Sequence, residues 1–215
     1  SGHIKGTFKP TEHSELTLGW TGSRDEWSST ATRDYRLDSD TFTGEFKISD
    51  AEEKWINLNI KGAVNELDLS QWDSGVGSGY DLRTSSFDIW NSSYFETGMI
   101  AHELTVGGDW VYDDFTSRAA SGGADTYNPV GTRQVWGAYV QDKLTYDWLE
   151  IVAGLRYDSY ELEATSKNSG DRFSPRLSVG VSPFKEGVLS GLQVYGSYSE
   201  GYRAPNTSEA YITGG

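Results

Sequence analysis

The chain has 215 residues, with 18 basic and 32 acidic side chains and a net charge of −14. It contains no cysteine, which excludes disulfides, zinc–thiolate sites, iron–sulfur clusters and cysteine nucleophiles. The acidic excess argues against nucleic acid as a partner, because such a surface repels phosphate. No segment approaches the roughly 18–20 apolar residues of a membrane-spanning helix. Strands of a membrane β-barrel, which alternate apolar and polar residues, remain compatible with this composition.

Side chains of alternating polarity run through most of the chain, and this period of two is typical of β-strands. Over 172–183, for example, Phe173 and Leu177 fall on one face, and Ser174 and Arg176 fall on the other. The sequence therefore predicts an all-β protein. In chain order it predicts about ten strands, near residues 2–9, 15–22, 39–50, 55–65, 82–95, 101–112, 132–146, 148–160, 172–183 and 190–202.

The predicted connections alternate between short and long. The short ones lie near residues 10–14, 51–54, 96–100, 147 and 184–189, and the long ones lie near 23–38, 66–81, 113–131 and 161–171, with a last one beginning at 203. This order is typical of antiparallel up-and-down outer-membrane barrels, which have short periplasmic turns and long extracellular loops. Aromatic residues near strand ends, such as Trp20 and Tyr146, suit the girdles at the two membrane interfaces. A transmembrane barrel is therefore favoured over a soluble sandwich.

Three short motifs resemble one family of such barrels. Residues 198–206 read Tyr-Ser-Glu-Gly-Tyr-Arg-Ala-Pro-Asn, which resembles the Y-S-x-G-[FY]-[RK]-[AP]-P segment of TonB-dependent outer-membrane receptors. The motif residues are Tyr198, Gly201, Tyr202, Arg203, Ala204 and Pro205. One hairpin earlier, 173–177 is similar to that family's F-S-P-R-L strand, and 154–157 is similar to its G-x-R-Y strand.

The resemblance implies a 22-stranded barrel in the bacterial outer membrane, filled by an N-terminal plug domain. Residues 1–215 are expected to be part of one β-barrel domain, supplying about ten of the strands and no plug domain. The expected partners are membrane lipid, lipopolysaccharide and the energy-transducing TonB complex, which acts through the plug. A barrel enzyme is not expected, because no Ser/His/Asp set is visible. A passive outer-membrane channel stays open as an alternative, although it leaves the 202–205 motif unexplained.

The likeness is closest to haem and haemophore receptors, because the run SEAYITGG over 208–215 is similar to the T-E-x-x-x-T-G opening of their ligand loop. It implies active transport of an iron-bearing ligand, either haem or haem on an extracellular carrier protein. Siderophore and cobalamin receptors share the motif at 202–205, so they remain alternatives. Haem is expected as a transported ligand, without a covalently bound cofactor.

Candidate ligand-binding residues come from the motif at the predicted outer mouth and from aromatic residues in predicted outer loops. They are Tyr202, Arg203, Asn206, Trp27, Trp72 and Tyr127. Tyrosine can also ligate haem iron, so Tyr35, Tyr80 and Tyr127 are candidates for that role. His102 is expected on the lipid-facing side near the periplasm, in an interfacial role. The acidic loop residues lack EF-hand spacing, and no metal site is predicted.

Overall fold

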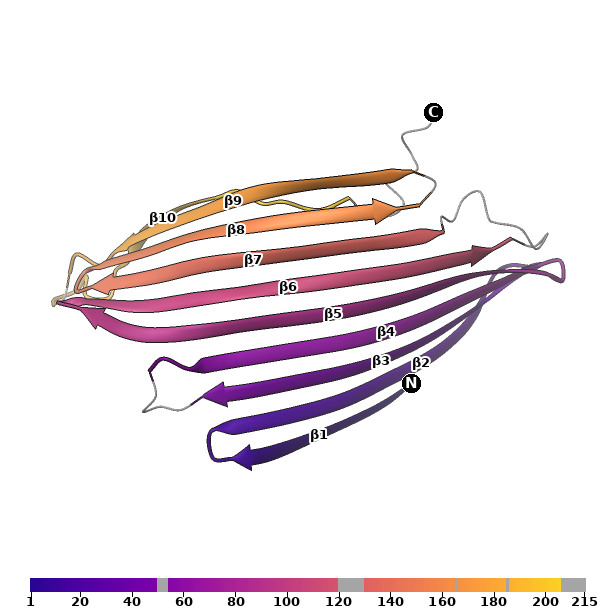
Figure 1. Ribbon diagram of the computed structural model, residues 1–215, viewed down its shortest axis with the longest axis horizontal. Coiled ribbons are helices and arrows are strands. Elements are labelled where there is room, and N and C mark those ends of the chain that lie inside the picture. The colour runs from indigo at the N-terminus through magenta and orange to yellow at the C-terminus, as the bar shows by residue number, and fades with distance from the viewer. Residues whose placement is uncertain (50–53, 120–129, 165, 185, 206–215) are drawn as a thin grey trace.

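The computed structural model describes residues 1–49, 54–119, 130–164, 166–184 and 186–205. Within them, ten β-strands form one antiparallel sheet in chain order, as Figure 1 shows. The strands are β1 (Gly2–Thr11), β2 (Ser14–Thr30), β3 (Arg33–Ser49), β4 (Asn57–Asp73), β5 (Val76–Thr97), β6 (Ile100–Arg118), β7 (Gly131–Tyr146), β8 (Leu149–Glu163), β9 (Lys167–Val181) and β10 (Val194–Ser199). The predicted up-and-down meander is confirmed. This described part of the chain holds no helix that could cross a membrane.

The sheet is curved, and β1 and β10 form its two edges (Figure 1). The turns at 12–13, 98–99 and 147–148 gather at one end, together with the β3–β4 and β9–β10 connections. The hairpin tips at 31–32 and 74–75 gather at the other end. The connections that were predicted to be short thus all lie at one end, the expected periplasmic end, and the opposite end is the expected outer mouth.

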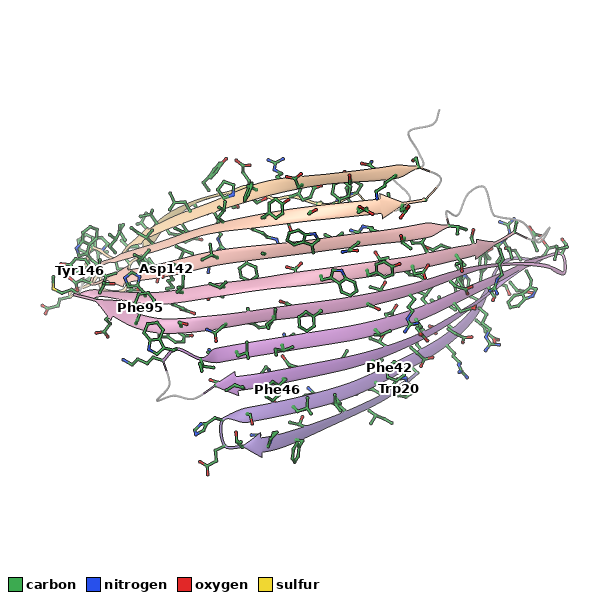
Figure 2. The ribbon with its side chains drawn as sticks, in the orientation of Figure 1. Trp20, Phe42, Phe46, Phe95, Asp142 and Tyr146 are labelled. Carbon is green, nitrogen blue, oxygen red and sulfur yellow. The ribbon has the colours of Figure 1, made fainter. Side chains whose placement is uncertain are left out.

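The strand register separates an apolar face from a polar face. On the apolar face, Trp20 lies opposite Phe42, and Phe46 lies opposite Ile60. Figure 2 shows Trp20 beside Phe42, with Phe46 further along β3 towards the periplasmic end. Phe42 is 53% exposed, which in water would be costly but in lipid is favourable. This face is the outer, lipid-facing wall.

Charged and small polar side chains occupy the other face. Glu45, Lys61, Asp88 and Asp109 follow one another across β3, β4, β5 and β6 in register. Buried polar residues of the described part, including Asp158, fall on this same face. The sheet is therefore apolar outside and polar inside, as in a membrane barrel with an aqueous interior.

Several strands are much longer than the membrane requires. β5 has 22 residues, which at ~3.3 Å per residue and a ~40° tilt span roughly 55 Å, about twice the ~25 Å apolar band of an outer-membrane barrel. The prediction of long loops at 23–38 and 66–81 was therefore wrong. These residues are strands, joined by two-residue turns at 31–32 and 74–75. Ser74 and Gly75 both have positive φ, as a tight hairpin turn requires.

Other boundaries also differ from the predictions. The predicted 161–171 loop shrinks to 164–166, and β6 continues through Arg118, whereas 120–129 lies outside the described residues. β10 covers only Val194–Ser199 rather than 190–202, because the chain then turns onto the inner wall. Polar residues on both faces caused these errors, since strands that project into water on both sides do not show alternating polarity.

Candidate ligand-binding site at the outer mouth

The chain leaves the sheet within the 198–205 motif and crosses the inner wall. Its last bond beside β9 runs from the Glu200 N–H to the Pro175 carbonyl, at 3.0 Å. Glu200 also accepts bonds from the Tyr198 hydroxyl at 2.7 Å and from Arg172 at 2.8 Å. These bonds fix the point where pairing with β9 ends.

Residues 202–205 then pass over the inner faces of β8 and β7. The ring of Tyr202 lies 6.2 Å from that of Tyr160 on β8. Ala204 is buried. The Pro205 carbonyl accepts a 3.0 Å bond from Nε of Arg133 on β7. Since Arg133 is near the outer end of its strand, the motif lies at the outer mouth on the inner side, where the resemblance placed it.

Arg133 is itself held by two neighbouring strands. Its Nη1 lies 2.8 Å from Oδ2 of Asp113 on β6, and the Thr84 hydroxyl on β5 donates to the other carboxylate oxygen at 2.8 Å. Phe115 and Leu162, the two fully buried large side chains of the described residues, neighbour this network in register. A small core therefore forms beneath the motif.

A second feature is an aromatic groove at the tip of the β2–β3 hairpin. Trp27 stacks on Tyr35, with ring centroids 5.1 Å apart and planes 7° from parallel. Both line a groove of about 360 Å³ together with Trp72 from β4. Trp27 and Trp72 were predicted to lie in loops. They lie on strands, and the register puts Trp27 and Tyr35 on the polar inner face and Trp72 on the opposite, outer face.

The structure brings some predicted site residues together and separates others. Tyr202 and Arg203 share the motif segment, and Trp27 and Trp72 share the groove. The groove lies on β2–β4, whereas the motif lies against β7–β9, so the two groups are on different parts of the wall. Asn206 and Tyr127 lie outside the described residues.

The tyrosine candidates for iron ligation differ in their surroundings. Tyr80 is on the part of β5 that projects beyond the apolar band. Burial raises the pKa of its hydroxyl, and the charge of Asp113 raises that pKa further, so its phenolate is harder to form. Tyr35 is engaged in the stack with Trp27. Within the described residues, no three His, Asp or Glu side chains are grouped to hold a metal ion.

Deeper in the inner wall, Arg156 joins three strands. From β8 it reaches across β7 to Asp109 on β6, with bonds of 2.7 and 3.0 Å, and it also bonds Asp158 at 2.7 Å. Gly137 makes this possible, because a Cβ there would contact the Arg156 guanidinium. Next to this bridge is an inner-wall groove of about 660 Å³ that includes Glu45, Lys61 and Asp109.

His102 lies on the outer wall at the periplasmic end, as predicted from the sequence. Its ring stacks on Phe95 at 4.6 Å. Its Nδ1 lies 2.8 Å from Asp142, and its Nε2 lies 2.6 Å from the Thr97 hydroxyl. Figure 2 shows Phe95, Asp142 and Tyr146 together at this end. The cluster ties β5, β6 and β7 together at the membrane interface.

Sequence reasoning missed the residues that hold the motif, namely Thr84, Asp113 and Arg133. Asp113 falls within the predicted 113–131 loop, and Arg133 falls at the start of the next predicted strand. In both places the polarity of the sequence did not indicate which face a side chain would occupy. The signal that could have found them is the alternation of faces along a strand, because both residues continue the inward-facing series of their strands.

Comparison with known proteins identifies the barrel. Residues 4–215 match the family described as "TonB dependent receptor-like, beta-barrel". The chain belongs to this family. The barrels of TonB-dependent receptors lie in the bacterial outer membrane.

The relatives of this receptor barrel include haem receptors. It is 26% identical over 188 residues to the "Hemin receptor" of Yersinia enterocolitica, covering 85% of this chain and 25% of the relative. It is 25% identical over 214 residues to the "TonB-dependent heme receptor A" of Haemophilus influenzae, covering 83% and 29%. The chain thus spans about a quarter of the length of the curated relatives it matches.

Solved structures show the same fold. The hemophore receptor HasR of Serratia marcescens, solved with its hemophore HasA and heme, matches with a TM-score of 0.84 and 18% identity, over 96% of this chain and 36% of that chain. The alcaligin outer-membrane receptor FauA of Bordetella pertussis matches with a TM-score of 0.73 and 13% identity, over 92% and 34%. These likenesses confirm the receptor-barrel fold.

Proposed function

We propose that this receptor captures an iron-bearing compound at the outer mouth for TonB-driven uptake, and that the compound is haem or haem on a carrier protein. The haem receptors among its relatives support this proposal, as does the SEAYITGG run at 208–215. HasR was solved with a hemophore, which supports a carrier protein as partner. The single observation that carries the proposal is the motif segment, which is folded inward over the lumen at the outer mouth.

Two sets of residues take part in capture under this proposal. Tyr202 and Arg203 lie on the inward-folded segment, where a ligand above the lumen would meet them. Trp27, on the inner face, and Trp72, on the outer face, both border the groove at the hairpin tip, and each flat aromatic ring can stack on a planar ligand. Asn206 and Tyr127 complete the proposed set of binding residues.

The remaining partners follow from family membership. A plug domain, supplied by the rest of the receptor, would occupy the polar interior, and the charged inner-wall groove beside Asp109 offers it a complementary surface. The TonB complex would act on that plug. Membrane lipid contacts the apolar outer wall, and lipopolysaccharide meets the charged strand ends above it.

A haemin titration of the complete receptor in detergent tests the proposal. The Soret band is expected to shift on binding. Trp27→Ala with Trp72→Ala should weaken binding. Trp136→Ala serves as the control, because Trp136 is 41% exposed, much like Trp72 at 40%, but lies within the apolar band, whereas Trp72 is on the part of β4 that projects beyond it. In cells, haemin as sole iron source should support growth only when TonB is present.

The alternatives predict different outcomes in the same assays. A siderophore or cobalamin receptor would require TonB for growth on its own ligand but would give no haemin titration. A passive channel would support uptake without TonB. Either outcome would contradict the haem proposal.

A further inference from the structure

An inward-facing side chain of β7 bonds the end of the motif segment to the wall. Arg133 donates from Nε to the Pro205 carbonyl at 3.0 Å. The bond joins residues 72 positions apart. Its acceptor on the segment is a backbone carbonyl rather than a side chain. The bond therefore fixes the position of the Pro205 backbone at the end of the motif, whichever residues follow it.

Arg133 is well placed to act as a rigid support. Its side chain is 22% exposed, and that of its partner Asp113 is 14% exposed. The Nη1 bond to Asp113 and the Thr84 bond to the same carboxylate leave the guanidinium little freedom. A guanidinium has its donors in a fixed planar fork, so holding Nη1 on Asp113 aims Nε at the carbonyl.

We propose that Arg133, oriented by Asp113 and Thr84, is the positioning residue that holds the 202–205 segment over the lumen and so sets the ligand-capturing geometry of the outer mouth. This inference rests on the proposed function, since it assigns a role in capture. Arg133 does not itself have to touch the ligand. It acts by keeping Tyr202 and Arg203 on the inner wall.

The test uses the complete receptor in outer membranes, with Arg133→Met as the principal variant. Arg156→Met is the matched control, because Arg156 is also an inner-wall arginine bonded to two carboxylates, Asp158 on its own strand and Asp109 on β6, but has no bond to Pro205. Arg133→Lys is a second variant that keeps a charge beside Asp113 while losing the planar fork. The faster migration of unheated, folded barrel on gels confirms that each variant assembles.

The first readout needs no ligand. Arg203 is exposed, so trypsin added from outside should cut the 203–204 bond faster once the segment is released. We expect the cleavage rate to rise about tenfold or more in Arg133→Met, as for loss of a hydrogen bond from a charged donor, and to a lesser degree in Arg133→Lys. Cleavage after Arg33 at the hairpin tip gives the internal reference. A rate equal to that of wild type and Arg156→Met would overturn the proposal.

The second readout is haemin affinity, which should fall about tenfold in Arg133→Met and stay near wild type in Arg156→Met. Unchanged affinity in a variant that is cut faster would overturn the role in capture. If the wild-type receptor itself fails to bind haemin, the proposed cargo is wrong. The cleavage rates still decide, independently, whether Arg133 holds the segment.

Discussion

Two arginines near the motif differ in what they contact. Arg172 is held by Glu200 at 2.8 Å, which helps to end β10, whereas Arg203 lies within the segment that passes over the lumen. Arg172 thus stabilises the departure of the chain from the sheet. Under the proposed function, Arg203 is one of the residues that would meet the ligand.

We expect Arg203→Ala to weaken ligand uptake more than Arg172→Ala, because only Arg203 belongs to the proposed binding set. Loss of the Arg172–Glu200 pair should have a smaller effect, since Arg172 is 49% exposed and exposed pairs contribute little. Growth on haemin as sole iron source, at matched receptor levels, measures both. Equal and negligible effects would remove Arg203 from the proposed site.

The His102–Asp142 pair allows a test of assembly rather than transport. His102→Leu should lower the stability of the receptor by about 1–3 kcal/mol, because it leaves the Asp142 carboxylate without its imidazole partner on the lipid-facing wall. The double variant with Asp142→Leu should recover part of this loss. Urea unfolding in lipid vesicles measures stability, and haemin uptake should not change. A double variant less stable than the single variant would contradict this account.

Some site residues could be predicted from neighbouring residues in the sequence, whereas others could not. Tyr202, Arg203 and Pro205 could be predicted because they form one contiguous motif. Arg133 and Asp113 could not, because their role depends on a contact made across 72 positions and because the strand that holds Asp113 was predicted to end at residue 112. The pairing of Trp27 with Tyr35 was hidden for the same reason, since it requires a hairpin where a loop was predicted.

A glycine on β7 allows an arginine on β8 to bond an aspartate on β6. Gly137 lies between Asp109 and Asp158 in register, and its missing side chain gives Arg156 the room to cross β7. On the inner wall, β6 and β8 are therefore linked by charge across β7, in addition to the backbone pairing of neighbouring strands.

Gly137→Ala is expected to destabilise the receptor by about 1–3 kcal/mol, because the added methyl group meets the Arg156 guanidinium and disturbs its bonds. Gly44→Ala is the matched control, since a Cβ there finds only an ordinary contact with Leu18. Urea midpoints of the complete receptor in vesicles measure the difference. If the urea midpoint of Gly137→Ala is no lower than that of Gly44→Ala, the prediction is wrong, because the Arg156 bonds then accommodate the added methyl group without loss of stability.

The number and order of the strands were predictable, whereas their outer ends were not. Alternation depends on two different environments, lipid and water, on the two faces of a strand. Beyond the level of Trp20, whose indole N–H bonds Asp40 at 2.9 Å, both faces meet water. The polarity signal ends there, but the backbone pairing continues to the hairpin tips.

The two edge strands of the sheet, β1 and β10, limit how this part of the barrel can be stable in a membrane. Among the described strands, β1 pairs only with β2, and β10 pairs only with β9. Unpaired backbone groups are very costly in lipid, which is why membrane strands form closed barrels. In the expected 22-stranded barrel, further strands would cover these edges.

Residues 1–215 produced alone are therefore expected to aggregate and to show no heat-dependent gel shift, whereas the complete receptor should show one. Intact mass and detergent extraction provide the measurement. A folded, detergent-dependent species of 23.8 kDa would indicate a small closed barrel and would contradict the expectation of a 22-stranded barrel.

The projecting β2–β3 hairpin has a consequence for recognition from outside the cell. From Trp20 to the turn at 31–32, about ten residues at ~3.3 Å each and a ~40° tilt raise the tip roughly 25 Å above the outer girdle. Its shape is set by ladder hydrogen bonds rather than by loop sequence. A cyclised peptide covering 24–38 should therefore reproduce this tip as an antigen, and antibodies raised against it should bind intact bacteria.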